Sequence, residues 1–118
     1  MPGEKVLVVE DDSSWSAIFE RRLQRVGLVA IMAKTVAEAE AAFNANSDIA
    51  LIAMDGSLGE EARLDTGDLV RMMRQSFKGP IIAMSSLPAR RQLRDAGCDH
   101  EVEEKGDLNQ KICDLLGV

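Results

Sequence analysis

The sequence predicts an α/β fold in which five strands form a parallel sheet with helices on both faces. Five short apolar runs alternate with amphipathic stretches along the 118 residues, with no linker or repeat between them. Strands that alternate with helices build parallel sheets through right-handed crossovers. Aromatic residues make up only 3% of the chain, so the core must consist of Ala, Val, Ile, Leu and Met side chains.

The expected strands are short runs of mostly apolar residues. They cover residues 5–10, 28–33, 49–54, 81–84 and 100–104. The first run is nearly continuous in apolar character, which is typical of a strand buried on both faces of a parallel sheet. The last contains a single apolar residue, Val102, and is therefore expected at an edge. Five such strands most commonly take the doubly wound, flavodoxin-like order 2-1-3-4-5.

The first helix follows the first strand directly. Ser13 or Ser14 can cap its N-terminus, because serine accepts hydrogen bonds from free helical N–H groups. The apolar positions run from Trp15 to Val26 at spacings of three and four residues, which places them on one face. Gly27 then ends the helix.

The later helices carry similar signals. Thr35 and Glu38 form a capping box ahead of the second helix. A third helix is expected over residues 68–77, before a Gly-Pro pair that breaks it. A short fourth helix precedes the last strand. Asp107 with Gln110 is expected to cap the fifth.

Composition and charge exclude several classes of protein. Lys plus Arg number 14 against 20 Asp plus Glu, and the net charge of −6 disfavours binding to nucleic acid or to an anionic membrane. Two cysteines are too few for a disulfide framework and have no metal-type spacing. No apolar stretch is long enough for a signal peptide or a membrane span. We expect one soluble, cytoplasmic domain.

Polar side chains gather where the expected strands end. Glu10 and Asp11 come at the end of the first strand, and Asp55 ends the third. Ser85 follows the fourth strand and Lys105 the fifth. Such sheets bind ligands outside the carboxyl ends of their strands, at the switch point between strands 1 and 3. We therefore expect these side chains to meet at one rim.

Carboxylates packed this closely repel one another unless a positive charge lies between them. Mg²⁺ suits the cluster because it takes one or two carboxylates, keeps several waters and shares a position with a phosphate. For Asp12, which is next to the first helix, favourable charge at the helix N-terminus is the better explanation.

Four segments in this order resemble a response-regulator receiver domain of two-component signalling. They are KVLVVEDD at 5–12, the apolar strand ending in Asp55, PIIAMS at 80–85, and AGCD followed by Lys105. The resemblance covers 1–118 as one receiver domain without an output domain. It implies that Asp55 accepts a phosphoryl group from the phosphohistidine of a histidine kinase.

The resemblance also implies roles for the residues around Asp55. Glu10, Asp11 and the backbone carbonyl of Ser57 would hold Mg²⁺ together with the nucleophile. Lys105 and Ser85 would contact the phosphoryl oxygens. This set agrees with the chemistry, because phosphoryl transfer needs positioning, a metal and a cation more than a general base.

Several features depart from the family pattern. The loop 59–66 is longer than usual, and the fourth helix, beginning near Pro88, is shorter. The fifth strand lacks the aromatic residue expected there. Lys105 comes one residue later than usual and precedes Gly106 where the family has proline. A bulge at the end of the fifth strand could absorb the extra residue.

Two other functions are compatible with the sequence. A pseudo-receiver, which binds proteins without transferring phosphate, would fit the long loop, the short helix and the shifted Lys105. Residues 54–58 also look like the motif of haloacid-dehalogenase phosphatases, but in that register Ala53 takes the place of the nucleophile. We expect no enzymatic activity beyond the chain's own phosphotransfer and dephosphorylation.

The expected partners are proteins. A histidine kinase or phosphotransfer protein would supply the phosphoryl group, and an unidentified protein would respond to it, with the chain a monomer or weak dimer. Arg90, Arg91 and Arg94 form a basic patch on the fourth helix, which indicates either solvated charges or a place for an acidic partner.

Overall fold

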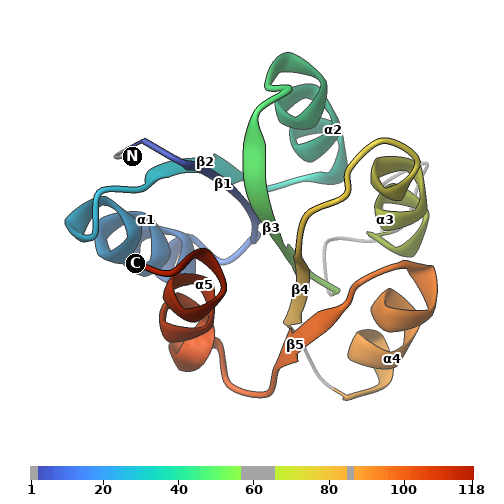
Figure 1. Ribbon diagram of the computed structural model, residues 1–118. Helices are drawn as coiled ribbons and strands as arrows, with labels where there is room; N and C mark the ends of the chain where they lie inside the picture. The colour runs from blue at the N-terminus through green and yellow to red at the C-terminus, as the bar shows by residue number, and fades with distance from the viewer. Residues whose placement is uncertain (1–2, 57–65, 85–86) are drawn as a thin grey trace.

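Five parallel strands form one sheet in the order β2-β1-β3-β4-β5 within the residues that the structure describes, 3–56, 66–84 and 87–118 (Figure 1). The structure is a computed structural model. Its strands are β1 (Lys5–Val9), β2 (Val29–Ala33), β3 (Ile49–Asp55), β4 (Ile81–Met84) and β5 (His100–Val102). The predicted strand order is therefore confirmed, and the three-residue β5 lies at an edge as expected.

Helices cover both faces of this sheet. They are α1 (Ser13–Arg25), α2 (Val36–Ala45), α3 (Thr66–Arg74), α4 (Leu87–Ala96) and α5 (Leu108–Leu116). Helices α1 and α5 pack on one face, while α2, α3 and α4 pack on the other (Figure 1). No described helix is long and apolar enough to cross a membrane.

The two core layers follow from the alternation of side chains along β1. Val6 and Val8 point towards α1 and α5, whereas Leu7 and Val9 point towards α2 and α3. All four are fully buried. Burying each such side chain stabilises the fold by about 1.5–3 kcal/mol, which is why a nearly continuous apolar run forms a central strand.

Helix α1 begins one residue earlier than a serine cap would place it. The side chain of Asp12 accepts hydrogen bonds from the backbone N–H groups of Ser14 at 2.8 Å and Trp15 at 3.2 Å, so the cap predicted at Ser13 or Ser14 is wrong. At the other end, Val26 lies just beyond the helix and is 45% exposed instead of buried. Gly27 makes the turn that follows, with a positive φ of 83°.

The capping interaction of α2 was predicted, with one difference. Thr35 Oγ1 accepts a hydrogen bond from the Glu38 backbone N–H at 3.0 Å. The Glu38 carboxylate accepts from the backbone N–H of Lys34, at 2.7 Å, and not from that of Thr35. Both contacts fix the path of the chain from β2 into the helix.

Replacing Thr35 by alanine is expected to lower the free energy of unfolding by about 1 kcal/mol, because one helical N–H loses its acceptor. Urea unfolding of Thr35→Ala and Thr35→Ser measures this, since serine keeps the hydroxyl. Equal stability of the two variants would contradict the capping role.

The start of α5 differs from the prediction. A 3₁₀ turn over Lys105–Asp107 leads directly into the helix, and Asp107 makes no side-chain cap hydrogen bond. Its backbone, with φ −90° and ψ −5°, is not in the extended conformation that a capping residue needs. Gln110 instead donates a hydrogen bond to Asp114 at 2.8 Å.

Helix α3 ends earlier than the prediction of a helix over residues 68–77. Its last residue is Arg74, so Phe77 packs against the core from the turn beyond the helix.

Candidate functional site

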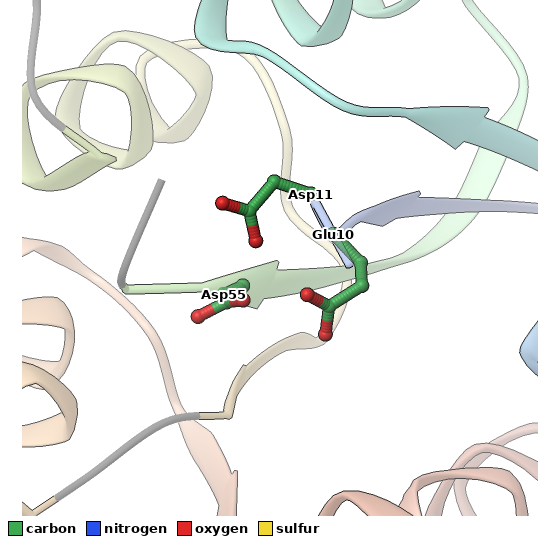
Figure 2. Close-up of side chains that lie close together, drawn as sticks. All are labelled: Glu10, Asp11 and Asp55. Carbon is green, nitrogen blue, oxygen red and sulfur yellow. The ribbon is translucent and has the colours of Figure 1, made fainter. Parts of the chain in front are cut away.

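The carboxyl ends of β1 and β3 lie side by side, because Val9 pairs with Met54 in the sheet. Glu10 and Asp11 follow β1 directly, and Asp55 is the last residue of β3. One carboxylate oxygen from each lies within 4.8 Å of the other two. Figure 2 shows the three side chains around the strand ends. The structure thus brings together the three acidic residues chosen from the sequence.

These three carboxylates differ in their access to solvent. Glu10 is 0% exposed and Asp55 1% exposed, whereas Asp11 is exposed. A ligand approaching the rim from solvent would therefore meet Asp11 first and the two buried carboxylates behind it.

Lys105, at the start of the 3₁₀ turn that follows the edge strand β5, reaches the two buried carboxylates. Its Nζ lies 2.6 Å from Glu10 Oε1 and 3.1 Å from Asp55 Oδ2. The pairing of β4 with β5 is regular over His100–Val102, so no bulge interrupts the paired part of β5. Beyond Val102 the chain enters the 3₁₀ turn that begins at Lys105, and from there the ammonium points inward to both carboxylates.

Burial and the contacts among these charged groups shift the pKa values of Glu10 and Lys105. Burial raises the pKa of Glu10 to about 7, and the neighbouring Asp55 carboxylate adds to the rise. The contact with Lys105 and the Asp12 backbone N–H, 3.2 Å from Glu10 Oε2, act in the opposite direction. Burial by itself lowers the pKa of Lys105, but its contacts with Glu10 and Asp55 outweigh this and raise it. One ammonium thus faces two buried carboxylates.

Glu10 is also held by its backbone. Its N–H donates to the carbonyl of Ala33 at 2.9 Å, and its carbonyl accepts from Ser16 Oγ at 3.1 Å. Ser16 was not selected from the sequence. The available signal was a serine on the otherwise apolar, buried side of α1.

The donor set fits Mg²⁺. Carboxylate oxygens are the hard ligands that this ion takes, and the exposed Asp11 leaves one side of the cluster open to water. Glu10 Oε1 is buried, and the partner that the structure shows for it is the Lys105 ammonium 2.6 Å away. A divalent ion beside Asp11 would supply positive charge that Lys105 alone does not.

Two residues of the expected site lie outside the described residues. These are Ser57, whose carbonyl was expected to bind the metal, and Ser85, expected to contact phosphoryl oxygens. The flanking backbone is described: Gly56 N–H donates to the carbonyl of Met84 at 3.2 Å, and Met84 pairs with Asp55 in the sheet.

The arginines of α4 are arranged differently from the expected basic patch. Arg90 is buried, and both it and Arg94 make ion pairs with Glu101 of β5. Arg91 is exposed. Whether helix arginines face solvent or the sheet depends on packing, which the sequence alone did not show.

Comparison with known proteins adds the fold family. No family model matches the chain, and no curated protein matches it. Among solved structures, a two-component response regulator from Clostridium difficile has a TM-score of 0.81 and 19% identity, covering 97% of this chain and 96% of that one. A CheY-like receiver domain protein from Methanospirillum hungatei has a TM-score of 0.80 and 21% identity, and the match covers 97% of this chain and 94% of that one.

A third similar structure was solved with a metal ion. It is the receiver domain of a sensor histidine kinase from Pseudomonas aeruginosa, with magnesium coordinated in its active site cleft. Its TM-score is 0.79 at 22% identity, covering 98% of this chain and 99% of that one. The chain therefore has the CheY-like receiver fold, as the resemblance implied.

Proposed function

We propose that this chain is a signalling receiver that is switched by phosphorylation of Asp55. The phosphoryl group would come from the phosphohistidine of a histidine kinase or phosphotransfer protein. The observation that carries the proposal is the group formed by Glu10, Asp11 and Asp55, with Lys105 in contact with two of them. This group stands at the carboxyl end of a receiver-fold sheet, where such sheets bind ligands.

In the proposed reaction, a carboxylate oxygen of Asp55 attacks the phosphorus atom. The new P–O bond forms as the P–N bond to the donor histidine breaks, and the histidine nitrogen keeps the electron pair and takes a proton. The product is an acyl phosphate, a known covalent strategy for an aspartate nucleophile. Since the transferred group carries its charge on three oxygens, catalysis depends on positioning and charge neutralisation.

The chain's own residues have separate parts in this reaction. Glu10 and Asp11 would hold Mg²⁺ with Asp55, and the ion would neutralise charge on the carboxylates and phosphoryl oxygens. Lys105 already lies 3.1 Å from Asp55 Oδ2, so a short movement would bring its ammonium to a phosphoryl oxygen. Ser57 and Ser85 keep the roles that the resemblance implies. We expect no reaction beyond this phosphotransfer and the later dephosphorylation.

The test is intact-mass spectrometry after incubation with acetyl phosphate and MgCl₂. The wild-type chain is expected to gain one phosphoryl group, and Asp55→Asn none. EDTA should prevent the gain in the wild type. Asp114→Asn, which changes a carboxylate on α5 that pairs with Gln110, is the matched control and should react normally.

Two outcomes would contradict the proposal. An adduct on Asp55→Asn would place the phosphoryl group elsewhere. The absence of an adduct on the wild type, together with no change in Trp15 fluorescence on adding beryllofluoride and MgCl₂, would favour the pseudo-receiver. Trp15 is a suitable reporter because it lies in the first turn of α1, three residues after Asp12.

A further inference from the structure

A cavity opens at the end of the sheet opposite to Asp55. Its volume is about 350 Å³, and it lies between the end of α2, the start of β3 and the turn that follows α3. Ile49, the first residue of β3, lines this cavity, whereas Asp55 is the last residue of the same strand. The cavity is therefore separated from the acidic group by the length of a strand. We call it the distal cavity.

Two aromatic rings line the distal cavity. Phe43 and Phe77 meet edge to face, with ring centroids 6.3 Å apart and ring planes at 80°. Both side chains are only half-buried, although they pack against the core. They are two of the four aromatic residues in the chain, and the other two, Trp15 and Phe19, stack together on α1. Aromatic surface in a concave site favours contact with a flat apolar ring.

The walls of the distal cavity are held in place by the protein itself. The Arg74 guanidinium lies over the Phe77 ring, 5.9 Å from its centroid. Gly79 packs so closely against this ring that an added Cβ would lie 2.7 Å from Phe77 Cζ. The Asn46 amide donates to a backbone carbonyl of α2 at 2.8 Å and accepts from Lys5 Nζ at 3.3 Å. Because these groups are already ordered, a ligand would lose little affinity in ordering them.

The polar groups of the distal cavity are neutral. They are the amides and hydroxyls of Asn44, Asn46, Ser47 and Ser76. None of the residues that line the cavity in the described part of the chain is ionisable. The nearby Lys5 and Asp48 neutralise each other in an ion pair of 3.0 Å. The cavity thus offers hydrogen-bond donors and acceptors without a full charge, and burying a charged ligand there would be costly.

We propose that the distal cavity binds a small neutral molecule that carries one aromatic ring and an amide or amine group. The ring would lie against Phe43 and Phe77, and the polar group would bond to the asparagine amides and serine hydroxyls. Ligand cavities span about 300–1,000 Å³, so a volume at the lower end limits the ligand to about one ring system with short substituents. The site does not depend on the proposed phosphotransfer.

The test is a titration of the ¹⁵N-labelled chain with nicotinamide, a neutral aromatic amide, followed by ¹H–¹⁵N NMR. The backbone signals of Asn44, Asn46 and Phe77 are expected to shift saturably, while that of Asp11 stays in place. Nicotinic acid has nearly the same size but is an anion at neutral pH. It is expected to bind at least about fivefold more weakly than nicotinamide, because the lining residues offer no counter-charge.

A pair of variants tests the location of the site. Ser76→Tyr places a large side chain into the distal cavity from an exposed position and is expected to weaken nicotinamide binding at least about tenfold, because it occupies the space of the ligand. Gln75→Tyr is the matched control. It adds the same ring at the neighbouring exposed residue, outside the cavity lining, and should change binding less than about twofold. The NMR spectrum of each free variant verifies its fold.

Four results would overturn the proposal. Absence of saturable shifts up to the solubility of nicotinamide would exclude the site. Equal binding of nicotinic acid would contradict a neutral ligand. Equal weakening by Ser76→Tyr and Gln75→Tyr, or shifts at Asp11 without shifts at Asn44 and Asn46, would place the binding elsewhere. None of these results changes the expected mass of the phosphorylated chain, so failure here is distinguishable from failure at Asp55.

Discussion

Replacing Glu10 by glutamine is expected to raise the melting temperature of the metal-free protein at pH 8 and to abolish its stabilisation by Mg²⁺. Glu10 is fully buried, and burial raises its pKa to about 7 from an ordinary value of 4.5. The unfolded chain therefore ionises this carboxyl group more easily than the folded chain does. Glutamine keeps the shape of the side chain and needs no ionisation.

The sign of the effect follows from the direction of the pKa shift. As pH rises from about 4.5 to 7, the unfolded chain loses this proton before the folded chain does, so the folded state is progressively disfavoured. Above pH 7 the penalty is complete. Each unit of pKa corresponds to about 1.4 kcal/mol, so Glu10→Gln should gain roughly 1–3 kcal/mol at pH 8. The gain should shrink at pH 5, where the folded protein is already protonated at this position.

Thermal melts at pH 5 and pH 8, each with EDTA and with MgCl₂, measure both parts of the prediction. The matched control is Asp48→Asn, an exposed carboxylate 3.0 Å from Lys5 Nζ, where the ion pair lowers the pKa. This variant should gain no stability and should respond to Mg²⁺ like the wild type. A lower melting temperature for Glu10→Gln at pH 8 would show that its contact with Lys105 outweighs its burial.

The fold was predictable because the strand and helix patterns along the whole sequence indicate the same arrangement. Alternating apolar and amphipathic runs predict a parallel sheet, and the sheet places the ends of neighbouring strands together. Glu10, Asp11 and Asp55 could therefore be selected without knowing any side-chain conformation. The elevated pKa of Glu10 could not be predicted, because it depends on how completely the packed chain covers that carboxyl group.

The features that were not predicted depend on short segments or on the side of a helix. Whether Asp12 or a serine caps α1 depends on where the chain turns after β1, a matter of one residue. The path of Lys105 depends on a 3₁₀ turn that has no clear sequence signal. The burial of Arg90 required knowing that Glu101 points towards α4. The contacts of Lys105 and Arg90 are tertiary contacts of polar side chains, which periodicity does not report.

Arg74 illustrates the same limitation and carries the largest expected loss of stability. Its Nε donates to the carbonyl of Gly97 at 2.8 Å, and its Nη1 donates to the carbonyls of Phe77 at 3.0 Å and Gly79 at 2.7 Å. Its Nη2 lies 3.1 Å from Asp99 Oδ1. One guanidinium thus ties the end of α3, the turn before β4 and the turn after α4 to the start of β5.

Replacing Arg74 by alanine is expected to lower the free energy of unfolding by about 2–4 kcal/mol, because three carbonyl groups lose a charged donor. Asp99 Oδ1 also accepts a hydrogen bond from the Ile81 backbone N–H at 2.9 Å. Without Arg74 to hold Asp99, this hydrogen bond at the start of β4 should weaken as well. The Arg74 side chain also packs closely against Gly97, where an added Cβ would lie 2.6 Å from Arg74 Cγ. Urea unfolding of the wild type and Arg74→Ala measures the loss.

Two further variants separate the geometry of the guanidinium group from its charge. Arg74→Lys keeps the charge but cannot reach several carbonyls at once, so it should recover less than half of the loss. Arg71→Ala, on the same helix, removes an exposed pair with Asp68 that is worth at most about 0.5 kcal/mol. If Arg71→Ala and Arg74→Ala lost equal stability, or if lysine restored it fully, the carbonyl contacts would not be what holds these turns together.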